Sequence, residues 1–345
     1  MSDIVIATNA NTKLAQYLNK KFLTTAQDNI CLAKYATPSE LPSQAGSLTM
    51  RMFKRRKGDA SRVQTVTTEG QAITFANTVI DYVDVALVQY ADASRISARL
   101  QKVEIFNNVD KETAAQGEAA SAYFDNQLRN AIIDPASGSS KRIYAQGAAS
   151  FAALNTAGYT TGKLTCKDIK RLVTSLKNSP TNPAKPLKLT SDDGKLSWSG
   201  FIVLVSEDQS SDLQDDPDWK LLCQHSHPEL MQKGEIGQWA GAKILTTNLP
   251  FQEDGAGMEN TYVGTVTSGH NVIHTAIAFG DEGFGASDLA TGGNWMSPSV
   301  QVLDKADKSD VINQWIILAW TAYFGCKVLD RQWVAICKSV IGTAP

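Results

Sequence analysis

The side chains best suited to chemistry lie in one short segment, Cys223–His227, which holds two histidines and a cysteine. Imidazole and thiolate groups bind zinc, but zinc sites pair them at spacings such as CxxC with HxxxH and need four convergent ligands. Here Cys223 and His225 are only two positions apart, and the remaining histidines, His270 and His274, are distant in sequence. The spacing therefore favours a role without metal.

A second candidate is the acidic run Asp215-Asp216-Pro217-Asp218. It could bind Ca²⁺, but it lacks the EF-hand spacing and the closing glutamate. Carboxylates are favourable at helix N-termini, so a solvated turn at the start of a helix is the preferred interpretation. A metal-dependent hydrolase that uses Asp215 together with His225 and His227 is kept as an alternative of a different class.

Motifs for covalent catalysis and nucleotide hydrolysis are absent from the sequence. No serine lies in a GxSxG elbow, and no GxxxxGK[ST] loop occurs. The glycine-rich segment Gly280–Gly285 carries two carboxylates, which would repel phosphate. The sequence thus predicts a protein that is not an enzyme and has no catalytic, cofactor-binding or metal-binding residues.

The concentrated positive charge of the chain consists of Arg51, Lys54, Arg55, Arg56 and Lys57. Such a run can neutralise nucleic acid phosphates without any base-reading motif, or it can meet an acidic neighbouring chain. A solvated strand end is the commoner fate of surface charges. All three interpretations stay open at this point.

The bulk composition is that of a folded protein. The 345 residues are 43% hydrophobic and 20% charged, with a formal net charge of −2, so no global basic field attracts nucleic acid or a membrane. Five scattered cysteines without a CxxC pair indicate reduced thiols. No signal peptide is expected. The mainly apolar run between Asp310 and Lys327 is shorter than the ~20 residues that span a bilayer, so a buried strand is predicted there.

The first ninety residues contain segments that cannot form a core of their own. Leu14, Tyr17, Leu18 and Phe22 predict a short amphipathic helix over Asn11–Leu23. Leu48–Met52 alternates as a half-exposed strand does, and Ile73–Tyr90 is rich in β-forming residues. An extended two-stranded excursion is marginal alone in water, so we expect it and the preceding arm to lie on a neighbouring subunit.

The rest of the chain combines helices and strands. A long helix is predicted over Asp110–Ile133, with Tyr123, Phe124, Leu128 and Ile132 as its apolar stripe. Thr165 and Asp168 predict a capping box that starts a second helix. Phe201–Val205 is an apolar run typical of a strand covered on both faces. The tail returns to β character, which predicts an α+β fold. The predicted tail strands are Val300–Leu303, Trp315–Cys326 and Trp333–Cys337.

Several segments together resemble the phage major capsid proteins of the HK97 fold, in the branch typified by the N4-like coat protein. The most informative is Gly234–Thr247, a Gly-punctuated turn that leads into a short β segment. The other matching segments are Thr67–Gly70, Gln89–Asp92, Ala119–Asn130, Asp168–Leu176 and Phe201–Trp219. The Gly280–Gly293 region and the Trp-rich tail depart from the pattern of that family.

The resemblance implies an order of structural parts. These are an N-terminal arm at 1–56, an E-loop at 57–92, the first part of a P-domain at 93–170 with a spine helix at 110–133, an A-domain at 171–299 and C-terminal P-domain strands at 300–345. It also implies that the basic run lies at the junction of arm and E-loop, which favours an inter-subunit contact over DNA.

The resemblance further implies a major capsid protein that self-assembles, as hexamers and pentamers, into an icosahedral head around double-stranded DNA. Expected partners are other copies of the chain, a portal protein, a separate scaffolding protein, possible decoration proteins and packaged DNA, with no membrane. Assembly is expected in the host cytoplasm. An encapsulin-type nanocompartment shell is the alternative that shares the fold.

Overall fold

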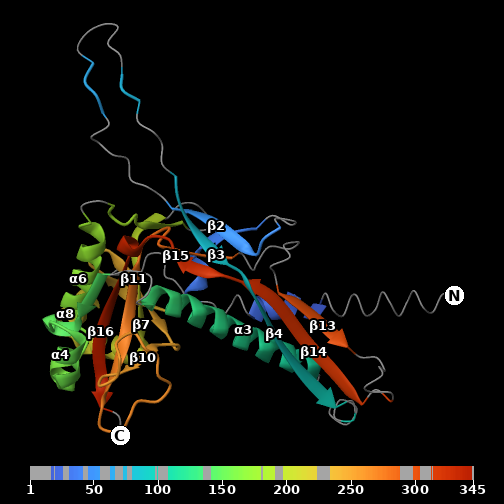
Figure 1. Ribbon diagram of the computed structural model, residues 1–345. Helices are drawn as coiled ribbons and strands as arrows, with labels where there is room; N and C mark the ends of the chain where they lie inside the picture. Colours follow the sequence, from blue (N-terminus) through green and yellow to red (C-terminus); the bar gives the residue numbers. More distant parts are fainter. Residues whose placement is uncertain are drawn as a thin grey trace. The chain divides into compact units, whose positions relative to one another are not determined.

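The computed structural model describes residues 17–18, 20–25, 31–41, 46–54, 63–66, 73–75, 80–97, 99, 108–134, 141–179, 182–190, 197–223, 234–287, 298–303, 312 and 314–343, without the side chains of 221–223 and 303. The chain divides into two compact units (Figure 1). The first comprises Met1–Met50, Asp84–Ala131 and Gly285–Lys327, and the second comprises Arg51–Val83, Ile132–Phe284 and Val328–Pro345. No described helix is long and apolar enough to cross a membrane.

A long helix and a three-stranded sheet build the first unit. The helix, α3 (Asn108–Ile133), confirms the predicted spine helix; its last two residues belong to the second unit. At about 1.5 Å per residue it is ~39 Å long. Of its predicted stripe, Phe124 and Leu128 are buried, whereas Tyr123 is exposed. The sheet has the order β13-β14-β4, from β4 (Val88–Ser97), β13 (Ser299–Leu303) and β14 (Trp315–Phe324).

Strand β14 has one buried face rather than two. Its burial alternates along the strand because successive side chains point to opposite faces of a sheet. Phe324 and Trp320 turn inward onto Phe124 of α3, with ring centroids 4.7 and 6.0 Å away. Trp315 and Ile317, on the other face, are exposed. The prediction of a buried strand is thus right for half of its side chains.

The described part of the arm packs onto its own unit, which corrects the expectation that the arm depends on a neighbour. Residues 17–18 and 20–25 are helical, and Leu18 and Phe22 are fully buried in the same cluster as Trp320. Downstream come the short helix η1 (Ala33–Tyr35) and β1 (Thr37–Ser39). β1 pairs with β12 (Phe284–Ser287), which lies beside β15 (Cys326–Val328). Two buried apolar side chains and one paired strand thus help to hold this stretch on its own unit.

An eight-stranded sheet forms the core of the second unit. Its order is β5-β16-β11-β7-β9-β8, with β10 paired to β11 and β6 paired to β7. These strands are β5 (Lys141–Tyr144), β6 (Leu187–Thr190), β7 (Ser197–Ser206), β8 (Glu235–Trp239), β9 (Ala242–Thr247), β10 (Phe251–Asp254), β11 (Asn271–Phe279) and β16 (Val334–Thr343). The prediction of a strand covered on both faces is confirmed, because Phe201 through Val205 are all buried in β7.

Helix α6 (Cys166–Lys177) packs against this sheet. It begins with the predicted capping box: Thr165 and Asp168 each accept the other's backbone N–H. Its predicted apolar face, including Ile169 and Leu172, lies in the main core cluster beside Ala276 and Cys337 of the sheet. The remaining helices of the unit are η4 (Ala145–Gly147), α4 (Phe151–Thr156), α5 (Tyr159–Gly162), α7 (Glu207–Asp215), α8 (Pro217–Cys223) and η5 (Arg331–Trp333).

The Gly-punctuated turn of Gly234–Thr247 is a tight β-hairpin. Strands β8 and β9 are antiparallel neighbours joined by Ala240 and Gly241. These two residues have φ angles of 53° and 84°. Positive φ at both central positions matches the twist of the flanking strands in a two-residue hairpin, and glycine adopts it without strain.

A second hairpin carries the β excursion. Strand β2 (Thr49–Lys54) pairs with β3 (Asp81–Ala86), and Met50 and Met52 of β2 are buried. Beyond the paired strands, segments 63–66 and 73–75 lie side by side (Figure 1). They are not strands, although Ile73–Tyr90 is rich in β-forming residues and was predicted to contribute to a hairpin-like excursion. The hairpin prediction is confirmed at its base, while Thr67–Gly70 lies outside the described residues.

Candidate assembly interface

The predicted basic run is described only at Arg51 and Lys54; Arg55, Arg56 and Lys57 lie outside the described residues. Arg51 is exposed on β2, and its guanidinium lies 3.9 Å from the ring centre of Tyr82 on β3. This stacking holds the guanidinium of an exposed residue in one orientation. A positive group fixed at the base of the excursion is suited to contact another chain.

Lys54 is already used within its own unit. Its Nζ lies 3.3 Å from Oδ2 of Asp330, a carboxylate that is almost fully buried. Asp330 also accepts hydrogen bonds from the Asn182 side chain and the backbone N–H of Gln332. The structure therefore separates Lys54, which neutralises a buried carboxylate, from Arg51, which stacks on Tyr82.

Large apolar side chains line the same excursion and are exposed to solvent. The extreme case is Phe75, with 94% of its surface accessible. Monomeric proteins rarely leave this much contiguous apolar surface in water unless it binds something. The exposed residues within the second unit's stretch of the excursion are Phe53, Val63, Val66, Ile73, Phe75, Ile80 and Tyr82.

Side-chain hydrogen bonds connect the two legs of the excursion. The Gln64 side-chain amide donates to the Thr74 carbonyl at 2.9 Å, and the Thr74 N–H donates to Gln64 Oε1 at 3.0 Å. This pair replaces a backbone ladder with one amide side chain. As a result, Val63 and Phe75 are presented on neighbouring legs, so a partner would meet both together.

The residues considered for a metal site have other partners where they are described. His270 Nδ1 lies 2.8 Å from Asp254, and His274 Nδ1 lies 3.0 Å from the Ser206 hydroxyl. The exposed Asp215 pairs with Lys220 at 3.6 Å. His225, His227 and the Cys223 side chain lie outside the described residues. Within the described ranges, no group of three or more His, Cys, Asp or Glu side chains could hold a metal ion.

The acidic run does start a helix, as predicted, because α8 begins at Pro217. Asp216 is more than a solvated residue, however. Its Oδ2 accepts the backbone N–H of Cys166 at 2.9 Å, and its Oδ1 accepts the N–H of Asp218 at 3.0 Å. One carboxylate thus satisfies donors at the starts of both α6 and α8.

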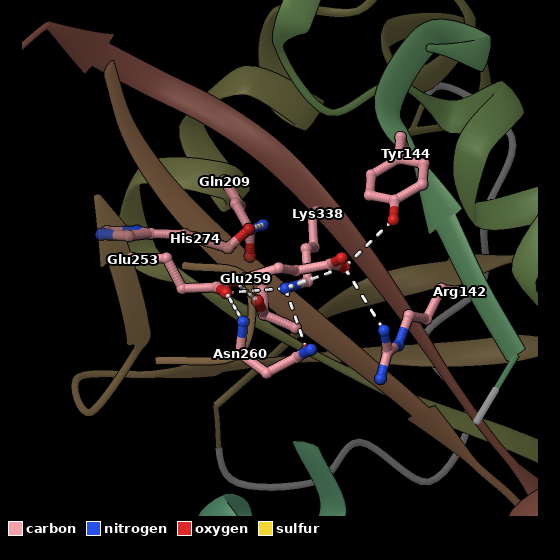
Figure 2. Close-up of polar contacts among 9 residues, drawn as sticks. Arg142, Tyr144, Gln209, Glu253, Glu259, Asn260, His274 and Lys338 are labelled. Atoms are coloured by element: carbon pink, nitrogen blue, oxygen red, sulfur yellow. Dashed lines mark hydrogen bonds and ion pairs between the residues drawn. The ribbon is translucent and has the colours of Figure 1, made fainter. Parts of the chain in front are cut away.

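Sequence reasoning missed a buried polar group in the second unit, which we call the Lys338 cluster. It consists of Arg142, Tyr144, Glu253, Glu259, Asn260 and Lys338 (Figure 2). Lys338 Nζ lies 2.7 Å from Glu253 and 3.4 Å from Glu259. The available signal was a lysine in the middle of an apolar strand, since charged residues are almost never fully buried without a partner.

Electrostatics in the Lys338 cluster follow from its burial. Desolvation lowers the pKa of Lys338, and the carboxylate of Glu253 opposes this shift. Tyr144 donates its hydroxyl hydrogen to Glu259 at 3.0 Å. Burial and that carboxylate raise the pKa of Tyr144 to about 12, so the hydroxyl stays protonated. Arg142 lies 3.7 Å from the same carboxylate, which gives Glu259 a second cationic neighbour besides Lys338.

Comparison with known sequences shows which family the chain belongs to. The sequence profile of the family described as phage capsid protein matches residues 59–303, more than half of the chain. The chain belongs to the phage capsid protein family. No curated protein matches this phage capsid protein. The match covers the excursion, α3 and most of the eight-stranded sheet.

Several solved structures with a similar fold are phage capsids. The capsid of Ralstonia phage GP4 has a TM-score of 0.63 at 12% identity, covering 89% of this chain and 87% of that one. The acid-stable capsid of Helicobacter pylori bacteriophage KHP30 has a TM-score of 0.62 at 10% identity, with coverages of 87% and 85%. The capsid of cyanophage Pam1 has a TM-score of 0.55 at 11% identity, covering 87% of this chain and 86% of that one. The phage capsid protein has the predicted α+β HK97 fold, and its family forms the shell of the virion by self-assembly.

Proposed function

We propose that this phage capsid protein is the major subunit of an icosahedral head, in which hexamers and pentamers enclose double-stranded DNA, and that it acts structurally rather than as an enzyme. The exposure of Phe75 and the other apolar residues of the excursion carries this proposal. Identical subunits close a shell through contacts between different patches of their surfaces. Membership of the family favours this function over an encapsulin-type nanocompartment.

The excursion of one subunit clasps a neighbouring subunit. Fully burying a Val, Ile or Phe side chain is worth about 1.5–3 kcal/mol. The two legs present Val63, Val66, Ile73 and Phe75, and all four are more than half exposed. Burial of several such side chains is comparable with the ~4–15 kcal/mol that association costs in lost freedom. The free energy from this burial therefore roughly offsets the cost of associating two subunits. Stable assembly then depends on many such contacts forming in one closed shell.

The remaining assignments rest on the same family relationship. Arg51, Arg55, Arg56 and Lys57 contact a neighbouring subunit in preference to DNA, while Lys54 serves Asp330. The subunit assembles in the host cytoplasm with a separate scaffolding protein, meets a portal protein in the head, and offers an outer surface for decoration proteins. Its nearest branch is the N4-like coat proteins, and the five parts from arm to P-domain strands keep the boundaries given by the sequence.

Assembly of variants tests the clasp. The full chain, expressed alone and with a scaffolding protein, is compared with Phe75→Ser by sedimentation and negative-stain microscopy. Met258→Ser is the matched control, because Met258 is also large, apolar and highly exposed but lies between β10 and β11. Wild type and Met258→Ser are expected to form closed particles, and Phe75→Ser to stay as smaller species with an unchanged circular dichroism spectrum.

Two results would contradict the proposal at different levels. If Phe75→Ser forms particles in wild-type yield, the proposed clasp is wrong, but the proposed shell function still stands. If the wild-type chain stays monomeric under every assembly condition, the proposed shell function itself is wrong. Nucleic acid in particles from infected cells separates a phage head from a nanocompartment.

A further inference from the structure

The Lys338 cluster places an amine, an amide and a carboxylate in contact within the buried part of the second unit. Lys338 Nζ lies 2.7 Å from Glu253 Oε1 and 3.1 Å from Asn260 Oδ1 (Figure 2). Lys338 and Glu253 have no solvent-accessible surface. The three residues come from β16, β10 and the segment between β10 and β11. A nucleophile, a proton acceptor and a carbonyl group are therefore neighbours.

Strand register explains why these side chains meet. Thr275 of β11 is paired with Lys338 on β16, and Ile273 of β11 is paired with Glu253 on β10. Positions two apart on a strand share a face, so Lys338 and Glu253 project from the same face on either side of β11. Between them, the Thr275 hydroxyl donates to Glu253 Oε2 at 3.0 Å.

The amide is also held in place by its backbone. Asn260 has a φ angle of 62°, and asparagine is one of the few side-chain-bearing residues that adopts this conformation readily. Its N–H donates to Glu253 Oε1 at 2.5 Å. The carboxylate that contacts the Lys338 amine thus also fixes the residue that carries the amide. Fixing reacting groups in this way replaces a bimolecular encounter by an intramolecular one.

The surroundings favour the uncharged form of the Lys338 amine. The Phe151 ring centre lies 5.0 Å from Lys338 Nζ, and Phe151 belongs to an apolar cluster with Ile273 and Val340. Burial penalises the charged ammonium and lowers the pKa of Lys338, so the amine gives up its proton more readily here than in water. Glu259 keeps Arg142 and Tyr144 as partners when the lysine loses its charge.

We propose that Lys338 and Asn260 form an intramolecular isopeptide bond, with Glu253 as the catalytic residue. Glu253 first takes a proton from the Lys338 ammonium. The neutral amine then attacks Cγ of Asn260, forming a new C–N bond. Protonated Glu253 gives its proton to the departing Nδ2 and accepts one from the attacking nitrogen, so the old C–N bond breaks and ammonia leaves. Glu253 ends protonated, the charge balances, and no oxidant or cofactor is consumed.

The bond would join β16 covalently to the segment that links β10 and β11. Strand β16 lies between β5 and β11, so this link fastens an inner strand of the sheet. A cross-link stabilises a fold mainly by restricting the unfolded chain. This inference does not depend on the clasp or on particle formation, since it concerns one subunit.

Mass spectrometry of the folded and then denatured full-length chain tests the bond. The wild-type mass is expected to be lower than the sequence mass by one ammonia, and a tryptic digest should contain the Lys338 and Asn260 peptides as one branched species. Asn260→Gly, which keeps the positive φ, and Glu253→Gln are expected to have their full sequence masses. Lys243→Met, which removes another buried lysine paired with a glutamate, is expected to retain the ammonia deficit.

A folded wild-type chain with its full sequence mass would overturn the proposal. A cyclic imide at Asn260 also releases ammonia, so Lys338→Met separates the two products. A deficit that persists in Lys338→Met, or a digest without the branched peptide, assigns the loss to the imide and likewise overturns the bond. If Lys338→Met does not fold, Glu253→Gln and the digest still decide the question.

Discussion

Lys54 Nζ and Asp330 Oδ2 lie 3.3 Å apart, so a lysine from the base of the excursion neutralises a carboxylate that is almost fully buried. The contact gives a residue from the predicted basic run a role inside its own subunit. It also shows why a run of positive charge in a sequence does not act as one patch. Neighbouring positions on a strand face opposite ways, so alternate residues meet different surroundings.

This pair should respond unequally to removal of its partners. Asp330→Ala leaves the Asn182 amide and the Gln332 N–H without their acceptor and is expected to destabilise the chain by about 2–3 kcal/mol. Lys54→Ala removes a one-third exposed group and leaves Asp330 its hydrogen bonds from Asn182 and Gln332, so the cost should be smaller, about 1 kcal/mol. Chemical denaturation measures both. If the two variants lose the same free energy of unfolding, the hydrogen bonds that Asp330 accepts do not add to the stability that the ion pair provides.

The charges that follow Lys54 are expected to act between subunits. Replacement of Arg55, Arg56 and Lys57 by glutamine should reduce particle yield while leaving the melting temperature unchanged. If these residues contact DNA instead, the variant should form the normal number of particles. Those particles should lose their DNA more readily as salt is raised, because phosphate contacts release counterions. Particle counts and DNA content across a salt series separate the two. The same replacement at Lys188, outside the run, serves as the control.

Asp125 fixes the arm to the spine helix of the first unit. Its carboxylate accepts the backbone N–H groups of Cys31, Leu32 and Ala33 at 2.7, 3.2 and 2.9 Å. Asp125→Ala removes all three acceptors and is expected to expose this stretch to protease, with a loss of about 2–3 kcal/mol. Glu118→Ala on the exposed side of the same helix is the control. Unchanged cleavage kinetics in Asp125→Ala would mean that Leu18 and Phe22 hold the arm unaided.

Protonation of His274 should make the free energy of unfolding depend on pH in the mildly acidic range. Burial lowers its pKa in the folded chain, although Asp208 acts in the opposite direction. The unfolded chain, with an imidazole pKa of about 6.5, then binds the proton at higher pH than the folded chain does. Stability is therefore fully present above that value and is lost as the pH falls toward the lowered pKa. His274→Asn should flatten this part of the unfolding profile, and chemical denaturation across a pH series measures it.

Local signals in the sequence were sufficient for much of the fold. The capping box at Thr165 and Asp168, the long helix before Pro135 and the apolar strand around Val203 each depend on neighbours close in sequence, and each is confirmed. Tyr123 was misassigned because a helix face can continue an apolar stripe into solvent. Its ring stacks 5.2 Å from Tyr90, a contact with a strand that helical spacing does not encode.

Contacts between distant segments could not be predicted in the same way. The arm was expected on a neighbour because it lacks a core of its own, yet Phe22 completes the aromatic cluster around Trp320. The Lys338 cluster joins residues almost two hundred positions apart, so only the order of strands brings Arg142 and Lys338 together. For the candidate interface, the run of charges was visible in the sequence, whereas the separate role of Lys54 depends on where Asp330 lies in the fold.

Strand β16 is the last of the eight strands to leave the ribosome, yet it belongs between β5 and β11, one strand in from the edge of the sheet. Until it emerges, β5 has no place to pair and one edge of β11 is open to any other strand. The sheet of the second unit therefore stays incomplete until the last of its eight strands has been synthesised. Unpaired strand edges are prone to mispairing, so this gap makes the nascent subunit vulnerable to aggregation.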